Sequence, residues 1–141
     1  MSAFTKFANF GLNLGRGKFN FSVDTLKALL SNVAPDAATA QQTADVTEIA
    51  AGNGYTAGGA AVPNLGWSQA AGTSTLVGDA IVFTASGGSL ATFRYAILYD
   101  ATSGYLIGYW DYGAAVTITT GNTFTVLPSN QATGGTILTQ T

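Results

Sequence analysis

Two residue types are missing from this 141-residue chain, which contains no cysteine and no histidine. The lack of cysteine excludes disulfide bonds, thiolate zinc sites, iron–sulfur clusters and a cysteine nucleophile. The lack of histidine removes the commonest metal ligand and the commonest general base. These absences exclude most catalytic templates, so we expect neither a cofactor nor a metal.

Charged side chains are also scarce, at 9% of residues, whereas a typical soluble domain has about 25%. Apolar residues make up 47% of the chain, and glycine occupies 18 positions. A free monomer normally stays soluble by covering itself with mixed charges. A chain with so few charges is suited to burying its surface against neighbours, so we expect a homo-oligomer, in the form of a homotrimer.

The charges that are present do not form a basic surface. The net charge is −2, and the five cations form only one loose group near the N-terminus. We therefore expect no nucleic-acid partner. No apolar run approaches the ~18 residues that span a bilayer, and the first residues lack a signal-peptide pattern. We expect no membrane partner and synthesis in a cytoplasm-like compartment.

The length fits one domain, which we divide into an N-terminal segment, residues 1–21, and a β-rich body, residues 22–141. The segment should form a short helix or an extended arm. Its apolar side chains could cap the domain's own core or dock on a neighbouring subunit. As candidate interface residues we take Phe4, Phe7, Phe10, Leu12 and Leu14.

Residues 22–33 fit two structures. Leu26, Leu29, Leu30 and Val33 match one face of a helix, but the same stretch can run as a half-buried strand. After Pro35 and Asp36, a polar loop with one helical turn should follow over residues 37–54.

From Gly52 onward, short apolar runs alternate with glycine-rich turns, which is typical of a sandwich or barrel. The predicted fold is mainly β, an antiparallel β-sandwich or barrel-like domain. We expect strands near residues 60–65, 66–69, 80–84, 91–99, 105–112, 116–118, 123–127 and 136–138.

The clearest pattern is a pair of apolar segments, residues 93–99 and 105–112, joined by a glycine-containing loop. This arrangement predicts an antiparallel hairpin. Regular alternation would place alternate residues of each strand on one face of that strand. In the first strand these are Phe93, Tyr95, Ile97 and Tyr99, and in the second they are Tyr105, Ile107, Tyr109 and Asp111. Both faces are largely apolar, so we expect the hairpin in the centre of the fold, covered on both sides.

The seven acidic residues are scattered, and most fall in expected turns. Asp45 and Glu48 could meet on one helical turn, but no further carboxylate lies nearby to complete a cation site. Asp111 should form a structural salt bridge with Arg94 on the partner strand. With no nucleophile–base pair in the sequence, we do not expect an enzyme.

Two further patterns have structural interpretations. The glycine-rich stretch 52–59 lacks the Lys-Ser/Thr ending of a phosphate-binding loop, so its glycines are expected to form turns. The tyrosines and Trp110 of the hairpin fit core and interface packing. A carbohydrate-binding module that stacks sugars on these rings is the alternative.

Three motifs occur together in this order: DTLKALL at residues 24–30, GNGYTAGGAAV at 52–62, and FRYAILYD with LIGYWDYG at 93–100 and 106–113. Together they resemble a family of small virion structural proteins of tailed bacteriophages, over most of the chain from Asp24 to Val126. The apolar N-terminal segment and the Gly/Thr-rich tail depart from that family's pattern.

The resemblance implies a capsid decoration, or cement, protein that binds the major capsid protein on the outer capsid surface and stabilises the head. It implies a location in the virion after synthesis in the host cytoplasm. A neck, tail or head-fibre component is the alternative within the same class.

Overall fold

The computed structural model describes residues 3–141, which form a mainly β domain with one short helix near the N-terminus. A five-stranded sheet has the order β1-β8-β7-β2-β3, and all its pairings are antiparallel. Its strands are β1 (Phe4–Lys6), β2 (Leu26–Ser31), β3 (Ala60–Ala61), β7 (Phe93–Asp100) and β8 (Leu106–Val116).

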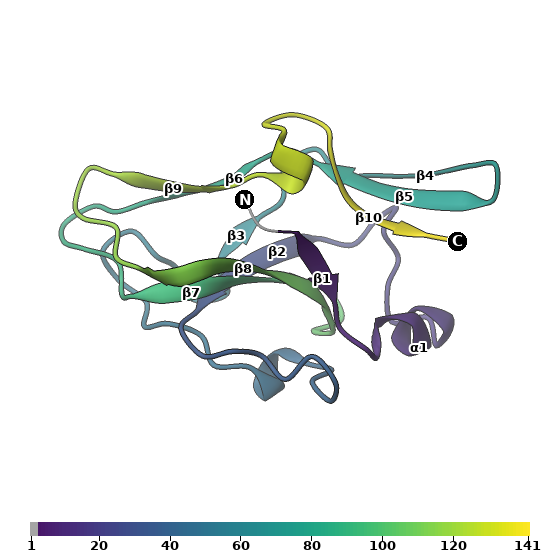
Figure 1. Cartoon of the computed structure of the whole chain (residues 1–141), viewed down its shortest axis with the longest axis horizontal. Helices are drawn as coiled ribbons and strands as arrows, with labels where there is room; N and C mark the ends of the chain where they lie inside the picture. The colour runs from purple at the N-terminus through teal and green to yellow at the C-terminus, as the bar shows by residue number, and fades with distance from the viewer. Residues whose placement is uncertain (1–2) are drawn as a thin grey trace.

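A second layer consists of two smaller sheets that lie side by side over the five-stranded sheet (Figure 1). One has the order β10-β5-β4 and the other pairs β6 with β9. Their strands are β4 (Gly66–Ala70), β5 (Thr73–Gly78), β6 (Ile81–Thr84), β9 (Thr123–Val126) and β10 (Gly135–Gln140). The expected antiparallel sandwich is thus confirmed, and the described sheets are open rather than closed into a barrel.

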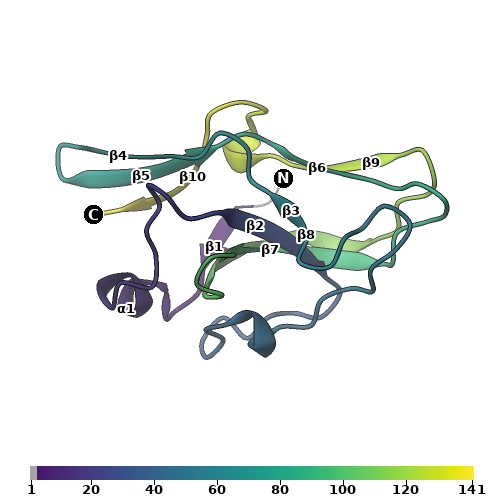
Figure 2. The ribbon, with the colours of Figure 1, turned by 180° about the vertical axis from the view of Figure 1, so that it is seen from behind.

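The remaining elements are short. Helix α1 (Phe10–Gly15) lies beside the β1 end of the five-stranded sheet, below the sheet of β4, β5 and β10, and Figure 2 shows it from behind. The 3-10 turns η1 (Thr43–Asp45) and η2 (Pro128–Asn130) lie in loops.

Two clusters of buried side chains cover the two faces of the five-stranded sheet. The main cluster lies between the layers and includes Leu98, Trp110 and Phe124. The second cluster includes Ile97 and Leu106, and it is covered by the loop that follows β2, through Ala37, Ala40 and Val46. The hairpin β7–β8 is therefore apolar on both sides because both sides are buried, as predicted.

Of the two structures that residues 22–33 fit, the strand is the correct one, because β2 pairs with β7 and the two buried clusters cover its faces. Three details differ from the sequence-based expectations. The strand expected near residues 60–65 is only the two-residue β3. Strand β5 was not predicted, because its sequence TSTLVG is rich in Thr and Ser and its only apolar stretch is Leu-Val. Residues 117–118 do not form a separate strand, and Val116 is the last residue of β8.

The prediction that alternate residues of each hairpin strand lie on one face is also wrong where the β7–β8 register shifts. The register shifts between Phe93 and Tyr95, and Phe93 packs in the main cluster while Tyr95 packs in the second. A second shift leaves Ile107 as an extra residue between the pairs Leu98–Gly108 and Tyr99–Leu106. Such bulges reverse the alternation of side chains between faces.

The glycine-rich stretch 52–59 is a pair of turns packed against other backbone, as expected. A Cβ on Gly59 would collide with the carbonyl oxygen of Ala28, and one on Gly54 with that of Thr84. Both glycines have positive φ, at +80° and +98°. This motif therefore specifies the fold rather than a binding site.

Candidate docking site

The N-terminal segment is integrated into the domain. Strand β1 pairs with β8 in the register Phe4–Trp110, and the two aromatic rings lie 4.7 Å apart. Phe10 packs against Phe19 and Phe21, with ring centroids 5.3 and 6.3 Å away. The described part of the segment thus contributes both a strand and an aromatic cluster to the fold.

The five candidate interface residues do not form one exposed surface. Phe7 and Phe10 are each 2% exposed and belong to the core. Phe4 and Leu14 are partly buried and pack against the main cluster. Only Leu12, at 49% exposure, presents a large apolar surface to a neighbour. The structure therefore matches the interpretation in which most of these side chains cap the domain's own core.

A groove of about 560 Å³ lies between β1 and β10. Its lining includes Phe4 and Trp110 from the five-stranded sheet, and Ile137 and Leu138 from the second layer. We call it the docking groove. The sequence did not indicate it, because its two walls are about 130 residues apart in the chain and meet only through the packing of the layers.

Both walls of the docking groove are strands at the ends of their sheets. Strand β1 ends the five-stranded sheet and β10 ends the three-stranded sheet. The ammonium of Lys6 donates a hydrogen bond across to the carbonyl oxygen of Thr139, at 3.2 Å. The carbonyl oxygen of Thr136 accepts the hydroxyl of Ser129, so part of the β10 edge is paired within the chain. Backbone groups that stay unpaired at a strand edge can bind an added extended segment.

Lys6 is the one charged residue among those lining the groove, and its ring contact is with Phe10, whose centroid lies 5.9 Å from Nζ. Within residues 3–141 no carboxylate lies at ion-pairing distance from it. A partner segment would therefore fit the groove best if its own side chains were apolar or small and if it placed a carboxylate beside Lys6.

The strands of the second layer lack charge, although Asp79 lies in the connection between β5 and β6. None of its five strands contains a charged residue. Its exposed side chains include Ser68, Gln69 and Val82. Free monomers usually protect such edges with lysine, proline or a bulge. The edge strand β4 contains neither lysine nor proline, so we call β4, β5, β6, β9 and β10 the uncharged layer and treat it as a candidate contact surface.

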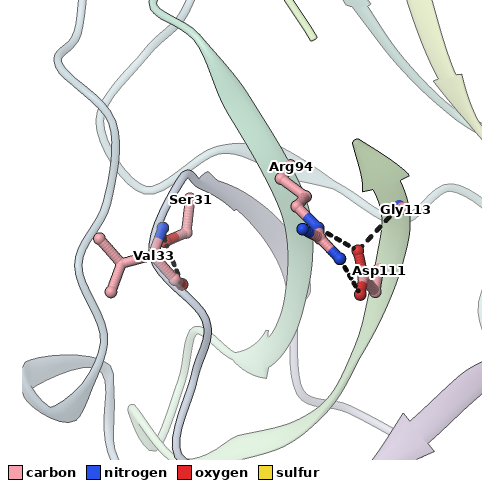
Figure 3. Close-up of polar contacts among 5 residues, drawn as sticks. All are labelled: Ser31, Val33, Arg94, Asp111 and Gly113. Carbon is pink, nitrogen blue, oxygen red and sulfur yellow. Dashed lines mark hydrogen bonds and ion pairs between the residues drawn. The ribbon is translucent and has the colours of Figure 1, made fainter. Parts of the chain in front are cut away.

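The predicted Arg94–Asp111 salt bridge is confirmed, and Figure 3 shows the two side chains pointing toward each other from β7 and β8. The guanidinium donates two hydrogen bonds, 2.8 Å from Nε to Oδ1 and 3.0 Å from Nη2 to Oδ2. These bonds and the amide of Gly113 lower the pKa of Asp111. The pair is partly exposed and has the geometry of a surface tie between two strands.

The other acidic candidates also have structural partners. Asp45 accepts the backbone N–H groups of Gln41 and Gln42, at 2.9 and 3.0 Å. Glu48 instead accepts the hydroxyl of Tyr55 and the amide of Gly58, both at 2.6 Å. Within residues 3–141, no group of three potential ligands could hold a metal ion.

Glu48 and two tyrosines hold the glycine-rich turns in place. The Tyr55 hydroxyl accepts the N–H of Leu30 at 3.0 Å, and the Tyr99 hydroxyl donates to the carbonyl of Gly58 at 2.6 Å. Burial, followed by the hydrogen bond to Glu48, raises the pKa of Tyr55. This network anchors the motif on β2 and β7.

The aromatic residues of the hairpin mostly pack inside the domain. Tyr95, Tyr99 and Trp110 are buried, whereas Tyr112 is 50% exposed. Their positions do not provide a row of exposed rings for stacking sugars. Among residues 3–141, no helix has the length and apolar character needed to cross a membrane.

Comparisons with protein-family models, with curated proteins and with solved structures found no match to this chain.

Proposed function

We propose that this protein is a capsid decoration protein, which binds the major capsid protein on the outside of a tailed-phage head and stabilises the shell without catalysis. The observation that carries the proposal is the uncharged layer, whose edge strand β4 contains neither lysine nor proline. Such a surface is poorly suited to a monomer in water and well suited to a packed neighbour.

Two further features support this function. The docking groove lies between β1 and β10, each the last strand of its sheet, which suits an extended segment of a capsid subunit. The motifs that resemble phage virion proteins lie at positions that build the sandwich, namely β2, the turns at 52–59 and the β7–β8 hairpin.

The mechanism would be mechanical. Each subunit would bury apolar surface across adjacent capsid subunits, at about 25 cal/mol per Å². A homotrimer would place equivalent uncharged surfaces around a three-fold axis of the lattice. Many weak contacts would together raise the barrier to rupture. A neck, tail or head-fibre component would use the same surfaces on a different part of the particle.

The test asks where in the particle the protein is found and whether adding it back restores the stability of heads that lack it. Mass spectrometry of purified tailed-phage particles should identify the chain, and gradient sedimentation should show the purified protein moving with intact heads. Heads stripped of the protein should release DNA at a lower temperature, and adding it back should restore the original temperature. Recovery only from isolated tails would support the alternative component, and failure to associate with any particle would overturn the proposal.

A further inference from the structure

Asp100 is an unusual residue for this position, because it is a carboxylic acid with 0% exposure at the end of strand β7. Its Oδ1 atom accepts the backbone N–H groups of Thr102 and Ser103, at 2.8 and 3.1 Å. Its Oδ2 atom is also buried but has no hydrogen-bond partner in the structure. A buried, ionised oxygen without a donor is costly.

The nearest charged neighbour makes the cost larger. Asp100 pairs in register with Leu26, and the carboxyl group of Asp24, which precedes β2, lies close enough to interact with that of Asp100. The Asp24 carboxylate accepts the backbone N–H of Asn20 at 2.9 Å, which fixes the turn before β2. Asp24 is the one charged group that acts on Asp100, and no lysine or arginine among residues 3–141 contributes.

The two segments that hold these acids are tied together by backbone contacts. The N–H of Ala101 donates to the carbonyl of Thr25 at 2.8 Å, and the N–H of Thr25 donates to the hydroxyl of Thr102 at 3.2 Å. The carboxyl groups therefore cannot move apart while these bonds persist. Two ionised carboxylates held in this way would repel each other.

We propose that Asp24 and Asp100 share one proton, and that this shared proton acts as a clasp joining the turn before β2 to the β7–β8 loop until rising pH releases it. The proton would sit on Oδ2 of Asp100, where it supplies the missing donor, and would point to the Asp24 carboxylate. Like charges that share a site ionise in two steps.

The electrostatic environment supports the clasp. Burial, and then the hydrogen bond that the protonated carboxyl makes to Asp24, raise the pKa of Asp100 from 3.8 to about 7, against the opposing effect of the Ser103 and Thr102 amides. The native chain therefore holds one more proton than the unfolded chain between those pH values. Its stability should be greatest at the acidic end of this range and fall as pH rises toward 7.

Few other groups of this protein make its stability depend on pH in the same range. The chain has no histidine, and hydrogen bonds lower the pKa of Asp36, Asp45, Asp79 and Asp111. The stabilising contribution of those carboxylates is lost only as the pH falls below the ordinary pKa of an aspartate. The α-amino group titrates near pH 8, but it is common to all variants and cancels when they are compared.

The experiment measures urea unfolding of the full chain between pH 5 and pH 8, together with a carbon-13 NMR titration of the Asp100 carboxyl group. In the native protein the unfolding equilibrium constant should rise by up to tenfold per pH unit toward pH 7. Asp100→Asn should remove this dependence and be more stable than the native protein at pH 8, because its amide donates to Asp24 permanently. Asp24→Asn should reduce the dependence.

Asp36→Asn is the matched control, since Asp36 is exposed, and it should leave the dependence between pH 5 and 8 intact. Amide exchange at Thr25 and Thr102, corrected for intrinsic rates, should accelerate above pH 7 in the native protein and in Asp36→Asn, but not in Asp100→Asn. An Asp100 carboxyl that titrates near 4, or an unfolding constant that is flat over this range, would overturn the clasp. Stabilisation at pH 8 by added Ca²⁺ that Asp24→Asn abolishes would replace it with a cation site.

Discussion

At the scale of single residues, the tightest constraint on this chain is the contact between Gly59 and strand β2. The backbone of Gly59 approaches the carbonyl of Ala28 so closely that there is no room for a side chain, and its φ of +80° is unfavourable for other residues. Gly121 has a similar φ of +84° but open space around it. The two positions therefore separate a packing effect from a conformational effect.

We predict that Gly59→Ala lowers the free energy of unfolding by more than about 3 kcal/mol, since strain and collision add. Gly121→Ala should cost about 1 kcal/mol, from the conformation alone. Chemical denaturation of both variants measures the difference. Equal losses of unfolding free energy in the two variants would mean that β2 moves to accommodate the methyl group added at position 59.

Ile97 offers a second test at this scale, because it is 0% exposed in the second cluster. Ile97→Asp should prevent folding, since a lone buried carboxylate costs several kcal/mol of the roughly 5–15 kcal/mol that stabilise a domain. Val82→Asp, at a position on β6 that is 52% exposed, should fold normally. Circular dichroism of the two proteins distinguishes them, and a folded Ile97→Asp would contradict the assigned core.

At the scale of elements, the N-terminal segment behaves as part of the sandwich. It supplies the edge strand β1, and its Phe7 and Phe10 side chains fill both buried clusters. The Phe4 ring also covers Trp110. An arm that only docked on a neighbour would leave these clusters complete without it.

Removal of residues 1–16 should therefore unfold or aggregate the protein rather than leave a folded domain. Truncating a buried phenylalanine costs about 3–5 kcal/mol, and the deletion removes two as well as the pairing of β1. Leu12→Ala, at an exposed position, should change stability by less than about 0.5 kcal/mol. Circular dichroism and solubility report the outcome. A soluble, folded truncation that no longer binds phage heads would restore the arm hypothesis.

At the scale of the whole molecule, charge is distributed unequally between the two layers. The five-stranded sheet carries Lys6, Lys27, Arg94, Asp100 and Asp111, whereas the strands of the uncharged layer carry none. Removing a charge from water is costly, so a charge introduced into a packed contact disrupts it. This difference makes the proposed contact surface testable without knowledge of the partner's sequence.

Gln69→Lys, on the exposed edge strand β4, should leave the fold intact but reduce trimer formation and binding to phage heads by at least tenfold. Ala38→Lys, which adds the same charge to an exposed loop beside the second cluster, should leave both unchanged. Sedimentation of each variant, alone and with heads, measures the effect. If Gln69→Lys binds as the native protein does, the uncharged layer is not the contact surface.

The sequence alone determined the β-rich class, the central hairpin, the Arg94–Asp111 pair and the turn-forming role of the glycines. Each of these depends on alternation, turn chemistry or residues on neighbouring strands, which act over short distances along the chain. It also excluded disulfides and sites that require cysteine or histidine, because those residue types are absent.

Only the tertiary structure decided the role of the N-terminal aromatics, the two bulges in the hairpin, the docking groove and the Asp24–Asp100 pair. The groove unites residues near the two ends of the chain, and the acid pair unites residues 76 positions apart. Neither contact has a local signature, because the register between β2 and β7 and the packing of the layers create them. An apolar side chain looks the same in sequence whether it fills its own core or a neighbour's, and burial in the folded domain is what separates the two.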